Sequence, residues 1–266
     1  MILSSGPQWL PSLIATAAYG VVAAATDTAS QRLRGAVVVA WLAHAVAIVV
    51  DVAGIGSAAI GARFGFAPAL SATVWLVVGV YGVESRFVPL PGARRVLALT
   101  AIIALLVALV FPGEVHPQVA FASAPLHWVL GIASYGLFGA AVLHALLLDA
   151  RERRMRSSAM SGDSGGVPLL RLERLTFRFV AAGFVVLSAA IVLGALNAPS
   201  WRWDHKTVFS VLGWLTFAAL LAGRQAFGWR GRRATRWLYI GAALLLLAYV
   251  GSRFVFEVVL GRTAIS

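Results

Sequence analysis

The sequence predicts an all-α, polytopic membrane protein with eight transmembrane helices and both termini outside. Two bulk properties support this class: 60% of the 266 residues are hydrophobic, and only 12% are charged. Soluble domains carry about 25% charged residues. The deficit indicates that most of the protein surface faces lipid rather than water. We expect residues 1–266 to form a single transmembrane helical domain.

Eight apolar segments are long enough, or nearly long enough, to cross a bilayer, for which a helix needs roughly 20 mostly apolar residues. They cover residues 8–26, 36–55, 66–84, 95–111, 126–149, 172–196, 206–223 and 234–258. We expect a cytoplasmic loop at about 150–171 and outer loops at about 112–125 and 197–206. The first segment lacks the positively charged start of a secretion signal, because no Lys or Arg precedes Arg32, so we interpret it as a retained helix.

The basic residues predict the orientation of these segments, because cytoplasmic loops are enriched in Lys and Arg. With the N-terminus outside, the loops after the odd-numbered segments hold sixteen of the 22 basic residues, and the opposite side holds four. This bias supports eight membrane-crossing helices with both termini outside. The formal net charge of +12 then orients the chain against anionic lipid, so the bilayer rather than nucleic acid is the expected partner.

His44 is an ionisable side chain in the middle of an expected span. His44, Ile48 and Asp51 follow Trp41 by 3, 7 and 10 residues, so the four share one helical face. Ionisable groups inside spans are costly and by default suggest function. A neutral histidine hydrogen-bonded to a neighbouring helix is the alternative, and position alone does not decide between the two.

His127 begins the fifth apolar segment on the outer side. Gly131, Ser134 and Tyr135 follow it on one face, where small residues leave room for a flat apolar group or for a close helix neighbour. The positive end of the helix dipole favours a neutral imidazole, which is the form that ligates iron. Ordinary helix packing is the competing interpretation.

Two tryptophans and a carboxylate precede the seventh apolar segment. Asp204 is well placed as an N-cap, and tryptophans at a membrane surface often serve as anchors. Alternatively, Trp201 and Trp203 stack on a porphyrin, with Arg202 or Lys206 near a propionate. The chain has no cysteine, so any ligand to a metal or to haem must be His, Met, Tyr or a carboxylate.

At these positions the chain resembles the cytochrome c assembly proteins of the CcsA, CcmC and CcmF type, and most closely their YpjD-like branch. The resemblance covers about residues 30–260. That family has a Trp-x-Trp-Asp element before a helix, and Trp201, Trp203 and Asp204 match it. His127 matches a histidine at the outer start of a helix, and His44 matches an early membrane histidine. In contrast, His205 stands where many relatives have proline, and two later histidines of the family are absent.

The resemblance implies a protein that binds haem and presents it at the outer face of the inner membrane. His127 would be the outer axial ligand, and His44 or His205 the second. The implied platform for the haem cofactor consists of Trp201, Trp203 and Asp204. The implied partners are the lipid bilayer, haem and other cytochrome c assembly components.

The absent histidines favour an alternative from another class. In that interpretation the chain is a haem-free accessory or regulatory membrane protein, for transport or metal resistance, that retains the same fold. Enzyme activity is not expected in either case, because the sequence has no hydrolytic triad with a plausible nucleophile, no phosphate-binding glycine loop and no H-E-x-x-H motif.

Overall fold

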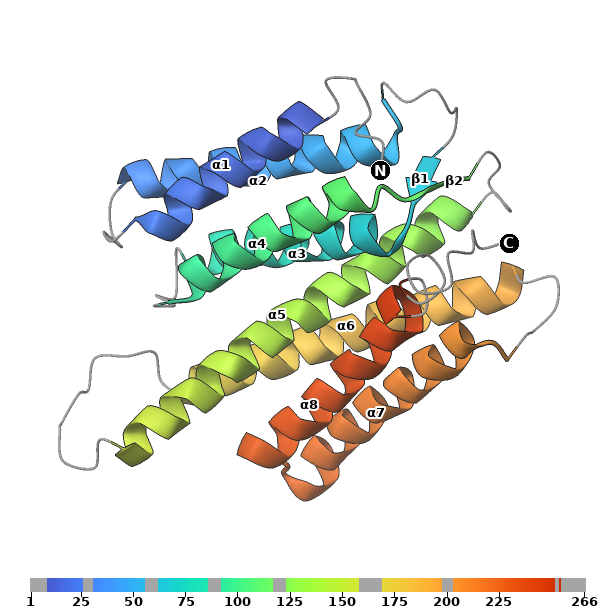
Figure 1. Ribbon diagram of the computed structural model, residues 1–266. Coiled ribbons are helices and arrows are strands. Elements are labelled where there is room, and N and C mark those ends of the chain that lie inside the picture. The colour runs from blue at the N-terminus through green and yellow to red at the C-terminus, as the bar shows by residue number, and fades with distance from the viewer. Residues whose placement is uncertain are drawn as a thin grey trace. The chain divides into compact units, whose positions relative to one another are not determined.

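The described part of the chain is almost entirely helical. The computed structural model describes residues 9–25, 31–55, 62–85, 92–116, 123–157, 169–197, 203–251 and 254. These residues form eight α-helices (Figure 1). The helices are α1 (Leu10–Ala24), α2 (Gln31–Val52), α3 (Phe66–Glu84), α4 (Ala93–Val110), α5 (Ala124–Ser157), α6 (Leu169–Asn197), α7 (His205–Phe227) and α8 (Gly231–Leu246).

Seven helical stretches in the described residues are long and apolar enough to cross a membrane, which confirms the prediction of a polytopic membrane protein. Their outward side chains are apolar, as contact with lipid requires; Val185 is 66% exposed and Leu196 78%. The remaining helix, α1, has 15 residues. At 1.5 Å per residue it is about 22 Å long, which is shorter than a hydrocarbon core of about 30 Å.

Three details differ from the sequence-based expectation. The loop expected from residue 150 begins later, because α5 continues to Ser157 through a run of Arg and Glu, which are good helix formers. After α8 the chain winds into a π-helix at Leu247–Gly251. Two short strands, β1 (Ala62–Phe64) and β2 (Glu114–His116), add an antiparallel ladder with Arg63 opposite Val115.

The chain divides into two compact units. The first comprises Met1–Val83, Pro91–Ala122 and Val250–Ser266, and the second comprises Glu84–Leu90 and Ser123–Tyr249. In the first unit α1 packs against α2 and α4, and the β1–β2 ladder lies beside α2. That the two units act as one transmembrane domain stays a prediction.

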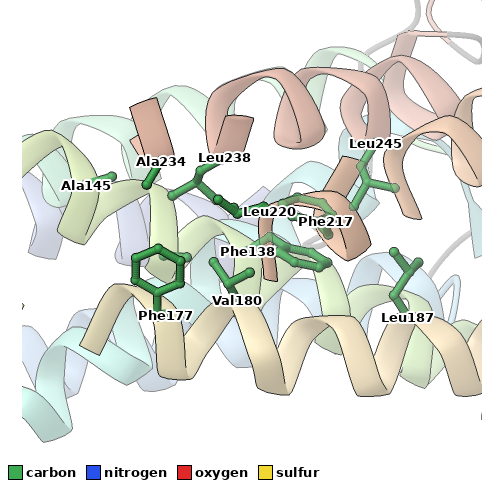
Figure 2. Packing of buried hydrophobic residues seen from close by; sticks show 11 residues of the cluster. Phe138, Ala145, Phe177, Val180, Leu187, Phe217, Leu220, Ala234, Leu238 and Leu245 are labelled. Atoms are coloured by element: carbon green, nitrogen blue, oxygen red, sulfur yellow. The ribbon is translucent and has the colours of Figure 1, made fainter. Parts of the chain in front are cut away.

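The second unit is a ring of four helices, in which α5 contacts α6 and α8, and α7 contacts α6 and α8 (Figure 1). Phe138 of α5 and Phe217 of α7 stack at its centre, with ring centroids 3.8 Å apart and planes inclined by 10°. Val180, Leu220, Leu238 and other buried apolar residues surround this pair (Figure 2). The aromatic core joins α5 and α7 at the middle of the unit, and the candidate site lies at the ends of α5, α6 and α7.

Candidate functional site

His127 lies in the first turn of α5, at a helix start, as the sequence predicts. Its Nδ1 is 2.9 Å from the backbone carbonyl oxygen of Ala190 in α6. A carbonyl oxygen only accepts hydrogen bonds, so Nδ1 carries the proton of the neutral ring. Nε2 then presents a lone pair. A hydrogen bond from one ring nitrogen to a backbone carbonyl is how proteins fix metal-ligating imidazoles.

The close approach of His127 to α6 depends on Gly194. A Cβ atom at position 194 would lie 2.9 Å from Cε1 of the His127 ring and 3.3 Å from its Nδ1. The same ends of the two helices are fastened once more, because the Ser123 hydroxyl donates to Oδ1 of Asn197 over 3.0 Å. These contacts hold the imidazole in one orientation against α6.

The start of α7 contributes polar groups to the same unit. Asp204 is the N-cap of α7, and its Oδ1 accepts from the Thr207 backbone N–H over 2.8 Å, which confirms the capping interpretation. Partial burial raises the pKa of Asp204, but the hydrogen bonds from Thr207 and the charges of Lys206 and His205 outweigh this and hold it below its usual value.

Lys206 connects this helix start with two other parts of the unit. Its charge acts on the His127 ring, and its Nζ lies 5.8 Å from the ring centroid of Tyr249 in the π-helix. π-helical turns inside α-helices occur frequently at functional sites. His127, Lys206 and Tyr249 thus come from three helices to one end of the bundle. His205, the first residue of α7, is exposed.

The aromatic residues near this end have different surroundings. Trp203 is 69% exposed. Trp201 lies outside the described residues. Trp214, farther along α7, is a packing residue whose indole N–H donates to Ser188 Oγ over 2.8 Å and whose ring stacks on Phe184. Tyr135 donates its hydroxyl hydrogen to the Leu245 carbonyl oxygen.

His44 lies in the first unit, where it is fully buried. Its Nε2 is 2.9 Å from Ser71 Oγ in α3, and its Nδ1 is 3.4 Å from the Tyr19 hydroxyl in α1. The buried imidazole therefore joins three helices through polar contacts. This matches the interpretation of a neutral histidine hydrogen-bonded to neighbouring helices.

Sequence reasoning missed the residues that hold these histidines. Gly194, Ala190 and Tyr249 lie 63 to 122 residues from His127 along the chain. Tyr19 and Ser71 lie 25 and 27 residues from His44 along the chain. None belongs to a motif. Only the spacing of Asn197 and Gly194 near the end of an apolar segment offered a weak signal, since small and polar residues favour helix contacts in membranes.

A model of the family described as "Cytochrome C assembly protein" matches residues 37–260. The chain belongs to this family. The match covers the whole second unit as well as α3 and α4, so family membership rests on both compact units. The resemblance inferred from Trp203, Asp204 and His127 is thereby confirmed at the level of the family.

Individual relatives match shorter stretches than the family model. Inner membrane protein YpjD of Escherichia coli (strain K12) is 31% identical over 137 residues, which are 50% of this chain and 52% of that protein. Cytochrome c biogenesis protein CcsA of Synechococcus sp. (strain CC9605) is 34% identical over 86 residues, 30% of this chain and 28% of that protein. The chain thus spans about half or less of the length of these relatives. No solved structure matches it.

The helices and the relatives agree on location. Seven apolar helical stretches and a relative named as an inner membrane protein place this family member in the inner membrane as a multi-pass protein.

Proposed function

We propose that this member of the cytochrome c assembly family binds haem at the outer end of its second unit. The observation that carries the proposal is the hydrogen bond between His127 Nδ1 and the Ala190 carbonyl oxygen. It leaves Nε2 as the only ring atom able to bind iron and orients the ring before any ligand arrives. His127 would be the axial ligand through Nε2.

The neighbouring residues fit the other needs of haem. A propionate is an anion, and Lys206 supplies positive charge beside His127. Trp203, Asp204 and the undescribed Trp201 form the proposed platform, with Trp203 exposed enough to stack on a flat ligand. Bound haem would supply an iron centre; the chain's own residues would orient it and shield one face from water.

The second axial position remains a proposal with two candidates. His205 is exposed at the start of α7, in the same unit as His127. His44 has both ring nitrogens in contact with Ser71 and Tyr19, so ligation by His44 would first break a buried hydrogen bond. The energetic cost favours His205.

We infer that eight helices cross the membrane and that both termini lie outside. The distribution of Lys and Arg supports this orientation. The absence of cysteine from the sequence allows a direct test, because single cysteines can be introduced without background labelling. An impermeant thiol reagent should label Asn197→Cys in intact cells and should leave Ser85→Cys unlabelled until the membrane is opened. The reverse pattern would invert the topology.

The experiment on haem uses the whole chain, expressed in haem-replete cells and purified in mild detergent. The wild type should show a Soret band that His127→Ala loses, while both proteins elute as the same folded species. His127→Gly should recover a Soret band when imidazole is added, since the free ligand fills the vacated position. His205→Ala should shift the band if His205 is the second ligand. An unchanged Soret band in His127→Ala would refute the assignment.

A haem-free accessory or regulator of transport or metal resistance is the second candidate. The observation in its favour is that His44 is fully used in helix packing. Well-folded wild-type protein without a Soret band would support it. Presentation of haem to other cytochrome c assembly components, in contrast, predicts that a partner captured with the wild type is lost with His127→Ala.

A further inference from the structure

The three-residue turn between α7 and α8 concentrates positive charge without compensation along the chain. α7 ends at Phe227, and Gly228 follows with a left-handed φ of 63°. From His205 to Gly251 the sequence contains no Asp or Glu, yet the turn region carries a set of five arginines. The set consists of Arg224, Arg230, Arg232, Arg233 and Arg236. We refer to it as the turn arginines.

Arg230, Arg232 and Arg233 lie at the start of α8, where the helix dipole disfavours cations, whereas Arg224 lies in the last turn of α7. Arg230 is the N-cap of α8, no side chain caps this helix, and its first turn contains no acidic residue. The N-terminus of a helix carries a partial positive charge and attracts anions, so each arginine there is placed against the dipole. An anion bound at this turn would relieve both the repulsion among the arginines and the uncapped helix start.

Carboxylates on neighbouring elements do not neutralise the turn. Glu173 of α6 acts on Arg224, and Glu152 of α5 lies near Gly231, while Asp149 accepts from Tyr239 over 2.8 Å. Among the described residues, however, no carboxylate forms an ion pair with any of the turn arginines. Arg230, Arg232 and Arg233 are exposed. The positive charge therefore faces outward.

An aromatic side chain gives the turn a defined shape. The Trp229 backbone N–H donates to the Gly223 carbonyl oxygen over 3.3 Å, and the Trp229 ring covers Gly223, where a Cβ atom would lie 2.5 Å from it. The guanidinium of Arg233 lies 4.3 Å above the Trp229 ring centroid. Within the described residues, Trp229 Nε1 and Arg224 Nη1 are buried donors without an acceptor.

We propose that this turn binds the headgroup of one anionic phospholipid. The guanidinium groups of Arg230 and Arg233 would bind its phosphate. The ring of Trp229 would hold Arg233 in place through the cation–π contact. Arginine suits this role because its planar fork matches a phosphate. A small movement of Arg233 would also let an oxygen of the bound phosphate accept from the indole N–H of Trp229.

The position of the turn identifies a lipid as the occupant. α7 and α8 are both helices able to cross the membrane, so the turn between them lies at a membrane surface. Phe227, next to the turn, is 77% exposed, and such a side chain favours the apolar edge of a bilayer over water. Inorganic phosphate offers the same anionic oxygens but nothing for Phe227 to contact.

The test measures binding of phosphatidylglycerol and of phosphatidylcholine to the purified, detergent-solubilised full chain by native mass spectrometry. Phosphatidylglycerol should bind at least tenfold more tightly. The double variant Arg230→Gln/Arg233→Gln should lose about tenfold or more of that affinity, as expected for two basic groups at a membrane surface. Trp229→Phe keeps an aromatic ring beneath Arg233 and removes the indole N–H. It should lower the affinity for phosphatidylglycerol a few-fold.

A matched control is Arg171→Gln/Arg174→Gln, which removes two exposed arginines from the first turns of α6 and changes the net charge equally. It should alter the affinity less than twofold. Equal losses in both double variants would overturn the proposal in favour of diffuse attraction. Full displacement of the lipid by millimolar inorganic phosphate would also overturn it, in favour of a free-anion site, as would equal binding of the two lipids.

Discussion

Trp41 and Trp75 exchange hydrogen bonds between α2 and α3: each indole N–H donates to the backbone carbonyl oxygen of the other residue over 3.0 Å. Their rings stack, with centroids 4.7 Å apart and planes inclined by 11°. Lipid chains offer no acceptor for an indole N–H. The two hydrogen bonds therefore give both indole donors an acceptor, and they also join α2 to α3.

Replacing either tryptophan by phenylalanine keeps a stacked ring and removes one hydrogen bond. We expect Trp41→Phe and Trp75→Phe each to lower the free energy of unfolding by about 1 kcal/mol. The double variant should lose less than the sum, because the first substitution already loosens the second bond. Thermal or chemical unfolding in detergent measures all three, and strictly additive losses would show that the two bonds are independent.

Haem binding should be sensitive to substitution of Gly194, although less so than to substitution of His127. In Gly194→Ala the new Cβ would lie 2.9 Å from Cε1 of the imidazole, so the ring must leave the Ala190 carbonyl oxygen. We expect a weaker or shifted Soret band in a protein that still folds. Gly20→Ala is the control, since nothing lies within 4 Å of its added Cβ, and its spectrum should equal that of the wild type.

Asp204 should make the stability of the α7 start depend on pH. Its pKa in the folded protein lies below the usual value, so the carboxylate contributes stability above the pKa of the unfolded chain, about 3.9. That contribution is lost as the pH falls through the lower folded value. The protection of the Thr207 amide against hydrogen exchange, taken relative to the intrinsic exchange rate at each pH, should therefore fall at pH values below about 4.

Two variants separate the charge of Asp204 from its capping oxygen. Asp204→Asn retains an acceptor for Thr207, so it should keep the cap and abolish the acid-dependent change. Asp204→Ala should cost about 1 kcal/mol at neutral pH. An acid-dependent change that persists in Asp204→Asn would assign the titration to another group.

Gly241 allows α8 to approach the aromatic core of the second unit. A Cβ atom there would lie 2.7 Å from Cζ of Phe217, and Phe217 is fully buried against Phe138 and has no room to withdraw. Gly241→Ala should lower the free energy of unfolding by about 1–3 kcal/mol. Gly35→Ala, with nothing within 4 Å of its added Cβ, should be neutral or slightly stabilising. Equal stability of the Gly241→Ala and Gly35→Ala variants would mean that α8 and Phe217 can move apart without loss of stability.

The sequence alone determined the helices, because apolar length is a local property. Residues 66–84 were predicted as a span and form α3 with the same bounds, and Asp204 was recognised as a cap because the capping bond closes within four residues. His127 was placed correctly at a helix start for the same reason. The composition also sufficed to predict that most of the protein surface faces lipid.

Tertiary structure decided what the polar side chains contact. His127 offers Nε2 to a ligand because its Nδ1 is bonded to a carbonyl oxygen 63 residues away. The ring nitrogens of His44 instead contact Tyr19 and Ser71 on two other helices. The π-helix after Leu246 and the pairing of Ala62 with His116 likewise left no local signal. Such contacts follow from how helices pack, and the apolar residues that drive insertion into lipid are nearly interchangeable with respect to that packing.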